Sequence, residues 1–229
     1  MGRSQYDETW KLQKSLRHLR QIGSIDDLLL LTEHEHVYTI GKGGNDNHLL
    51  ASQEELKMGG VEVYHIDRGG DITYHGPGQI VGYPIIDLHE RKPDIHLYLR
   101  GLEETIILTL REFGILGIRE EGLTGVWIDG EKIAAIGINV SRWITMHGFA
   151  LNVNTDLARF GRIIPCGIFH KGITSIEKIL GKKIPLDDVE EVLEHKFMQV
   201  FGYNELHKIS PMELSEIINA APASMQIPK

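Results

Sequence analysis

Residues 68–79, Arg-Gly-Gly-Asp-Ile-Thr-Tyr-His-Gly-Pro-Gly-Gln, are the stretch from which both the fold and the site of this chain can be argued. They lie between two strand-like runs, residues 61–66 and 80–86. Glycine tolerates positive φ angles and lets a ligand approach the backbone closely. Four glycines among polar side chains therefore predict a rigid turn that lines a binding site, rather than a flexible linker. The structural alternative is a tight turn between two strands that carries polar side chains but lines no site.

The chain on both sides of this stretch alternates between strand and helix patterns. The expected strands are residues 28–32, 37–40, 61–66, 80–86, 126–128, 132–140 and 143–153. The expected helices cover residues 6–21, 52–58, 93–114, 187–201 and a short segment from Ser210. Asp129-Gly130 predicts a hairpin turn, and residues 159–171 are expected to form a loop. No repeat or linker divides residues 1–229, so we expect one α+β domain, with no role assigned to the segment after about residue 205.

Composition restricts the kinds of partner that are expected. Hydrophobic residues make up 41% and charged residues 24% of the chain, as in ordinary globular proteins. No apolar run approaches the ~20 residues that cross a bilayer, and the first residues lack a signal-peptide core. A single cysteine excludes an internal disulfide and suits a reducing compartment, so we expect a cytoplasmic protein. The net charge of −8 argues against nucleic acid as a partner.

Two residues are candidates for acid–base and nucleophilic chemistry. Cys166 lies in Pro165-Cys166-Gly167, a context that suits a reactive thiol better than a buried structural one. Lys132 begins an aliphatic strand, where partial desolvation favours proton exchange near neutrality; a solvated turn lysine is the alternative. His75 or His147 could serve Cys166 as a general base, as in a cysteine hydrolase.

Motifs for metals and nucleotides are missing from the sequence. His34 and His36 alternate with Glu33 and Glu35, but that spacing lacks a third metal ligand. Gly41-Lys42 is followed by glycine, not by the Ser or Thr of a Walker A loop. We therefore expect no metal and no cofactor.

Several motifs in a fixed order carry a family resemblance. They are Glu33-His34 with Thr39-x-Gly41, residues 68–79, Tyr83-Pro84, Gly125-Val126-Trp127, residues 132–137, residues 147–152 and Pro165-Cys166-Gly167. With them the chain, over about residues 6–176, resembles the octanoyl-acyl-carrier-protein:protein N-octanoyltransferases of lipoate biosynthesis. The resemblance implies mixed β-sheets wrapped by helices, the fold shared with biotin and lipoate protein ligases. It also implies further strand residues before the position of Gly2, so we expect one sheet edge to be short.

The resemblance also implies a reaction. Octanoyl-acyl carrier protein donates its acyl group to Cys166, whose thiol pKa is lowered by Lys132. The acyl group then passes to a lysine amine on the lipoyl domains of 2-oxoacid dehydrogenase E2 subunits or on the glycine cleavage H protein. The implied substrate contacts are Arg68, Gly69, Gly70, Asp71, Ile72, Thr73, Tyr74, His75, Ala135, Ile136, Gly137, Gly148, Phe149 and Ala150, with His147 and Gln79 in support. The apolar faces of Ile136 and Ile138 are expected to line a tunnel for the acyl chain.

Three other functions stay open at this point. An ATP-dependent lipoate or biotin ligase on the same fold would activate a free acid as an adenylate and would not need Cys166. A non-catalytic module would bind the carrier protein and tolerate Cys166→Ala. A cysteine hydrolase would release free octanoate.

Overall fold

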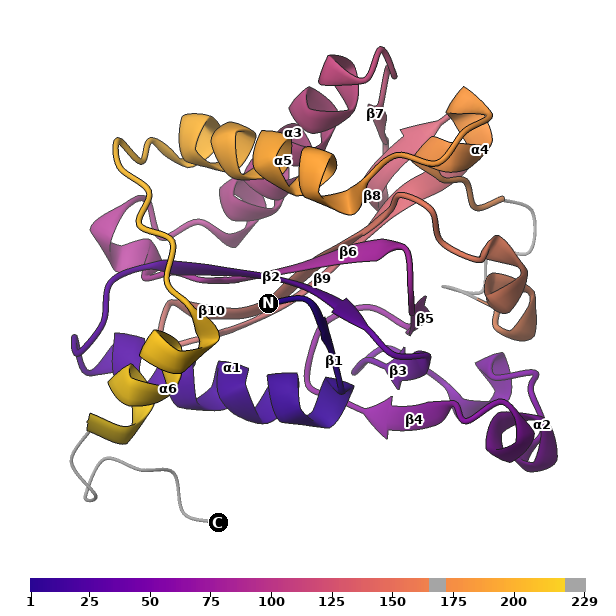
Figure 1. Ribbon diagram of the computed structural model, residues 1–229, viewed down its shortest axis with the longest axis horizontal. Helices are drawn as coiled ribbons and strands as arrows, with labels where there is room; N and C mark the ends of the chain where they lie inside the picture. The colour runs from indigo at the N-terminus through magenta and orange to yellow at the C-terminus, as the bar shows by residue number, and fades with distance from the viewer. Residues whose placement is uncertain (165–171, 221–229) are drawn as a thin grey trace.

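A mixed seven-stranded sheet forms the centre of the computed structural model, which describes residues 1–164 and 172–220 (Figure 1). The strands follow the order β1 (Arg3–Ser4), β2 (Leu28–His34), β6 (Gln79–Ile85), β10 (Ile144–Asn152), β9 (Glu131–Ser141), β8 (Leu123–Ile128) and β7 (Ile118–Glu120). β1 runs parallel to β2 at one edge, and the other neighbours are antiparallel. Every residue of β6 and β10 is buried, because these two strands lie near the middle of the sheet and helices cover both of its faces.

Two pairs of helices cover the large sheet. α1 (Tyr6–Gln21) and α6 (Pro211–Ala220) lie on one face, and α3 (Ile95–Glu112) and α5 (Leu186–Phe201) lie on the other (Figure 1). On the first face, Leu16 and Leu214 pack into the core that Val81 and Ile85 form on β6. The segment after residue 205, to which the sequence assigns no role, therefore contributes a helix to the core.

The second sheet has three strands in the order β4 (Glu62–His65), β3 (Val37–Ile40) and β5 (Ile72–His75). α2 (Gln53–Met58) and the 3₁₀ helix η3 (Leu157–Arg162) supply the side chains that pack on it, including Leu56 and Phe160. The remaining short helices are η1 (Asp46–His48), η2 (Leu88–Glu90) and α4 (Ile176–Leu180).

Predictions that rest on helix caps and turn residues are confirmed. Ser52 and Glu55 form the predicted capping box of α2. Asp129 and Gly130 have φ angles of 48° and 82°, as a tight β8–β9 hairpin requires. Ser210 exchanges hydrogen bonds with Glu213 at the start of α6.

Other expectations were wrong because long-range pairing decides the structure there. Residues 72–75 were expected in a turn, yet they form β5, which pairs with β3 along its whole length. Residues 159–162 were expected in a loop and belong to η3, while β7 and α4 were not predicted at all. Arg142 and Trp143 form a second tight hairpin turn, with φ angles of 50° and 64°, although neither residue is glycine.

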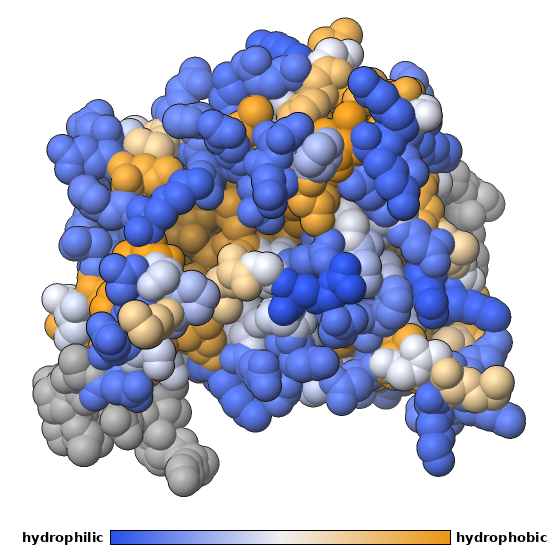
Figure 2. Space-filling view, in the orientation of Figure 1, coloured by the Kyte–Doolittle hydropathy of each residue, from blue (hydrophilic) through white to orange (hydrophobic). Residues whose placement is uncertain are grey.

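The face seen in Figure 2 is hydrophilic over the helices, with hydrophobic side chains gathered across the middle of the molecule, over β2. Among the helices that the structure describes, none combines the length and the apolarity needed to cross a bilayer.

Candidate active site

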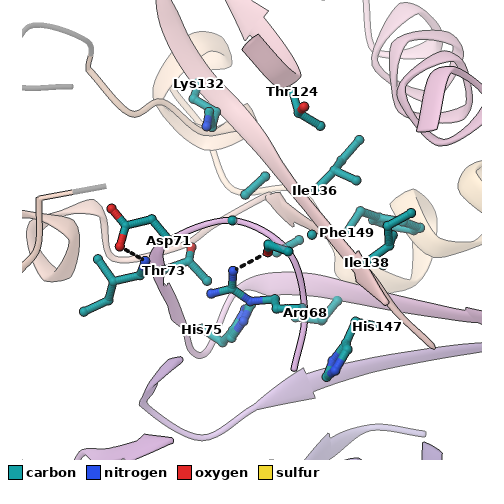
Figure 3. Close-up of a pocket in the computed structure, with 18 of the residues that line it drawn as sticks. Arg68, Asp71, Thr73, His75, Thr124, Lys132, Ile136, Ile138, His147 and Phe149 are labelled. Atoms are coloured by element: carbon teal, nitrogen blue, oxygen red, sulfur yellow. Dashed lines mark hydrogen bonds between the residues drawn. The ribbon is translucent and has the colours of Figure 1, made fainter. Parts of the chain in front are cut away.

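A cavity of about 470 Å³ lies between the large sheet and the stretch at residues 68–79. It brings together most of the residues expected to contact substrate, namely Arg68, Gly69, Gly70, Asp71, Ile72, Thr73, His75, Ala135, Ile136, Gly137, Gly148, Phe149 and Ala150. Lys132, Ile138, His147 and Gln79 line it as well. Figure 3 shows Lys132 and Ile138 well apart along the wall of the cavity, with Arg68 and His75 on the facing wall.

Tyr74 is the expected contact that does not share this wall. Its side chain is fully buried in the core of the small sheet and its hydroxyl shares a hydrogen bond with His36 Nδ1 at 2.6 Å. Successive side chains of a strand point to opposite faces, so Tyr74 points away from the face that carries Thr73 and His75 and into the core of the small sheet.

The cavity also includes residues that the sequence did not single out. They are Tyr6, Val81, Tyr83, Leu99, Gly122, Leu123, Thr124, Asn152, Phe160 and Ile173. They come from segments distant in sequence, so local patterns carried no signal for most of them. Tyr83 and Asn152 are the exceptions, because they belong to the motifs Tyr83-Pro84 and residues 147–152.

Backbone hydrogen bonds hold the glycine-rich stretch between the two sheets. The Gly69 N–H donates to Ile138 O on β9 at 2.8 Å, and Gly70 O accepts from the Gly43 N–H at 3.0 Å. Gly70 has a φ of +85°, the conformation for which glycine was expected here. A Cβ on Gly137 would lie 2.8 Å from Gly69 O, so the close approach of β9 to the stretch requires glycine.

Gln79 and Asn152 form the inner end of a buried polar network. The Gln79 side-chain Nε2 donates to Tyr74 O at 3.2 Å and to Asn152 Oδ1 at 2.9 Å. The Asn152 Nδ2 donates to Thr174 O at 3.1 Å. Since the two backbone carbonyls can only accept, they fix the orientation of both amide groups.

His75 continues this network toward Arg68. Gln79 Oε1 accepts from His75 Nδ1 at 2.8 Å, so the other ring nitrogen, Nε2, is left to accept from Thr39 Oγ1 at 3.4 Å. The Arg68 Nη2 donates to Thr39 Oγ1 at 3.0 Å and to Thr39 O at 2.7 Å. Burial lowers the pKa of His75 to about 3, which keeps the ring neutral near pH 7. With both nitrogens engaged, His75 is a structural residue here, and the hydrolase alternative loses one candidate base.

His147, the other candidate base, is oriented by a carboxylate. Its ring Nε2 lies 2.9 Å from Asp67 Oδ1, and its backbone N–H donates to Gln13 Oε1 at 2.9 Å. Burial lowers the pKa of His147 against the opposing effect of Asp67, while the hydrogen bond lowers the pKa of Asp67 to about 2. The neutral ring therefore donates its Nε2 proton to an ionised Asp67. His147 has a φ of +60° inside a strand, a conformation that is rare for residues with a side chain.

Asp71 links the stretch to the segment that precedes Cys166. Its Oδ2 lies 2.6 Å from His48 Nδ1, and its Oδ1 accepts the Ile72 N–H at 2.7 Å. His48 O in turn accepts the Ile164 N–H at 2.8 Å.

Lys132 lies at the start of β9, where backbone hydrogen bonds join it to Gly172 and Thr174, which follow Cys166 in the sequence. The Lys132 N–H donates to Gly172 O at 2.9 Å, and the Thr174 N–H donates to Lys132 O at 3.0 Å. The Lys132 Nζ lies 4.7 Å from the centre of the buried Trp127 ring. Cys166 itself lies outside the described residues.

The Glu33–His36 cluster has structural partners. His34 Nε2 shares a hydrogen bond with Tyr83 OH at 2.7 Å, and burial lowers its pKa to about 4. Glu33 binds Arg3 at 2.6 Å and accepts the Gly78 N–H at 2.8 Å. Within residues 1–164 and 172–220, no three His, Cys, Asp or Glu side chains are grouped as metal ligands.

The fold and this cavity define a class of protein. A family model described as the lipoyl protein ligase A/B catalytic domain matches residues 5–198. Among solved structures, a bipartite lipoate protein ligase from Thermoplasma acidophilum aligns with a TM-score of 0.67 at 17% identity, covering 90% of this chain and 86% of that one. A lipoate-protein ligase A bound with ATP aligns with a TM-score of 0.67 at 15% identity, covering 90% and 87%. The expected α+β fold is thereby confirmed.

Sequence relatives narrow the class. The octanoyltransferase of Rubrobacter xylanophilus is 52% identical over 88% of this chain and 91% of its own length. The octanoyltransferase of Caldicellulosiruptor saccharolyticus is 50% identical over 93% and 92%. The chain belongs to the octanoyltransferase family and is an enzyme of the acyltransferase class. The ligase alternative has less support, because the ligases are similar mainly in fold.

Proposed function

We propose that the chain transfers an octanoyl group from octanoyl-acyl carrier protein to Cys166 and then to a lysine amine. The acceptors would be the lipoyl domains of 2-oxoacid dehydrogenase E2 subunits and the glycine cleavage H protein. Because the step needs Cys166 as a free thiol, we infer a reducing compartment, the cytoplasm, as its setting.

The observation that carries the proposal is the set of residues that line the cavity at residues 68–79. This cavity is lined by Lys132, by the apolar residues Ile136 and Ile138, and by Phe160 and Ile173, which precede and follow the Cys166 segment in sequence. A nucleophile carried between those two residues would have a basic side chain and an apolar channel within the same site. The hydrogen bonds that join residues 172 and 174 to Lys132 give this arrangement further support.

In the resting enzyme we assign a Cys166 thiolate paired with a Lys132 ammonium. The face of the Trp127 ring attracts a cation and so supports the charged form of the lysine. A nearby ammonium lowers the pKa of a thiol and so supplies the nucleophile. A thioester is already activated, so this pair suffices without a third member.

Each half-reaction then balances in atoms and charge. The Cys166 sulfur attacks the donor carbonyl carbon, the carbon–sulfur bond to the carrier breaks, and the leaving thiolate takes a proton from Lys132 Nζ. In the second half-reaction a neutral acceptor amine attacks the Cys166 thioester and loses a proton to the now neutral Lys132. The amide forms and the thiolate–ammonium pair is restored.

The acyl chain would extend from this pair along β9. Ile136 and Ile138 lie on the same strand as Lys132, and Phe149 pairs with Ile136 on the neighbouring strand β10. All three line the cavity at a distance from Lys132 (Figure 3). Apolar side chains of this kind bind a saturated chain through burial of its methylene groups.

Octanoylation of a lipoyl domain with and without ATP tests the proposal. The wild type should transfer octanoyl from octanoyl-acyl carrier protein at the same rate in both conditions. Cys166→Ser and Lys132→Ala should lose at least about a hundredfold in rate, whereas Lys11→Ala, a change at an exposed lysine of α1, should not. Octanoylation from free octanoate that requires ATP would identify a ligase instead. Full transfer by Cys166→Ser would exclude the covalent route.

A further inference from the structure

A buried carboxylate on α3 has no part in the reaction described above. Glu103 is only 1% exposed and lies one helical turn beyond Leu99, which lines the cavity. Its Oε2 accepts from Arg100 Nη1 at 2.6 Å and from Arg119 Nε at 3.0 Å. Its Oε1 accepts the N–H of Gly125 on β8 at 3.1 Å. A buried charge is costly unless it is fully paired, and an apolar residue would pack α3 on the sheet without that cost.

The strand residue that Glu103 binds has an unusual conformation. Gly125 has a φ of +120°, which residues with a side chain rarely adopt. The register between β8 and β9 is irregular just beyond it, because Val126 lies opposite Ala134 while Trp127 lies opposite Lys132. One additional residue on β9 therefore forms a bulge next to Lys132.

Gly125 and Trp127 together form what we call the lysine seat. A Cβ on Gly125 would lie 2.6 Å from Ala134 O and 3.5 Å from Lys132 Cε, so the lysine stem passes over bare backbone. The Lys132 Nζ then lies over the Trp127 ring, 4.7 Å from its centre. The Gly125-Val126-Trp127 motif thus has a physical role, which is to support the stem and the head of one lysine.

We propose that Glu103 is a positioning residue for Lys132, which it acts on by holding the Gly125 end of the lysine seat. The proposal rests on the acyl-transfer role proposed for Lys132. Hydrogen bonds from Arg100 and Arg119 fix the Glu103 carboxylate, and its other oxygen anchors β8 where the bulge would otherwise let the strand shift. Displacing a reacting group by about 1 Å can cost a hundredfold in rate.

Glu103→Asp tests this with Glu104→Asp as the matched control. The shorter side chain keeps the charge opposite the two arginines but withdraws the oxygen from the Gly125 N–H. Glu104 is the next carboxylate on the helix, has a side chain that is 39% exposed, and pairs with the same Arg119 at 2.6 Å. Glu103→Asp should lower kcat with octanoyl-acyl carrier protein by about 10- to 100-fold while KM changes less than about twofold. Glu104→Asp should leave both within about twofold of wild type.

A second readout separates positioning from stability. Cys166 is the only cysteine of the chain, so iodoacetamide alkylation against pH reports its thiolate directly. Glu103→Asp should move that profile to higher pH, and Glu103→Gln, which keeps an oxygen for Gly125, should stay closer to wild type. A loss of activity that only follows the unfolded fraction in urea, or an unchanged kcat and alkylation profile, would overturn the proposal.

Lys132→Ala separates this inference from the proposed function. If Lys132→Ala leaves the alkylation profile and the transfer rate unchanged, the role of Lys132 itself is wrong. If Lys132→Ala changes both and Glu103→Asp changes neither, only the role of Glu103 is wrong.

Discussion

The Nζ of Lys132 lies 4.7 Å from the centre of the Trp127 ring, and the ring is almost fully buried. A cation over an indole face is stabilised by about 1 kcal/mol, which corresponds to about fivefold in an equilibrium constant. Trp127→Leu should therefore lower the transfer rate by at least about fivefold, and Trp127→Phe, which keeps an aromatic face, should lower it less. Single-turnover transfer from octanoyl-acyl carrier protein measures both. Equal rates for the two variants would show that the ring face has no influence.

Buried neutral histidines predict how stability depends on pH. The pKa of His75 is lowered to about 3 and that of His34 to about 4, while His36 and His147 are lowered as well. The unfolded chain takes up protons at these histidines below about pH 6.5, and the folded chain does so only at lower pH. The free energy of unfolding should therefore fall as the pH drops from about 6.5 toward 4.

Urea unfolding at several pH values checks this slope. His75→Gln should reduce it by up to about 1.4 kcal/mol per pH unit, the value for one proton. The lowered pKa of Asp67 affects the free energy of unfolding only below about pH 4, which is outside this range. A slope that is the same in wild type and His75→Gln would contradict a neutral, buried His75.

The contact between β9 and residues 68–70 predicts the effect of one methyl group. A Cβ at Gly137 would meet Gly69 O at 2.8 Å and Arg68 Cδ at 3.0 Å. Gly137→Ala should lower the free energy of unfolding by about 1–3 kcal/mol and weaken donor binding. Gly161→Ala is the control, because a Cβ there has open space around it, and it should change stability by less than about 0.5 kcal/mol. Similar effects of the two changes would mean that residues 68–70 shift to admit the methyl group at no cost in stability.

Chain-length preference should depend on Ile138, which lies farther along β9 from Lys132 than Ile136 (Figure 3). Ile138→Ala should raise the use of decanoyl relative to octanoyl donors, and Ile138→Phe should favour hexanoyl. One methylene in an apolar pocket is worth about 1–3 kcal/mol, so ratios should change by about tenfold or more. Competition between donors of different length measures the ratio. Unchanged ratios in both variants would remove Ile138 from the acyl-binding wall.

The sequence predicted those site residues whose role depends on their own segment, such as the glycines and the motif residues. It failed where pairing between strands decides which way a side chain points. The glycines of residues 68–79 indicated a stretch that lines a site, because a close approach to the backbone requires glycine and is therefore visible in the sequence. Tyr74 was placed with its neighbours because a turn was expected, and the alternation of β5 turns it to the other face. Tyr6 reaches the cavity from α1, and no local pattern pointed to it. Thr39 belongs to the motif Thr39-x-Gly41 and contacts the site through its hydrogen bonds to Arg68.

Intact mass after mixing the protein with octanoyl-acyl carrier protein, without ATP or acceptor, tests the central claim most directly. Wild type should gain the mass of one octanoyl group and lose it when a lipoyl domain is added, whereas Cys166→Ser should gain none. An unmodified wild type that still octanoylates the lipoyl domain would contradict transfer through Cys166.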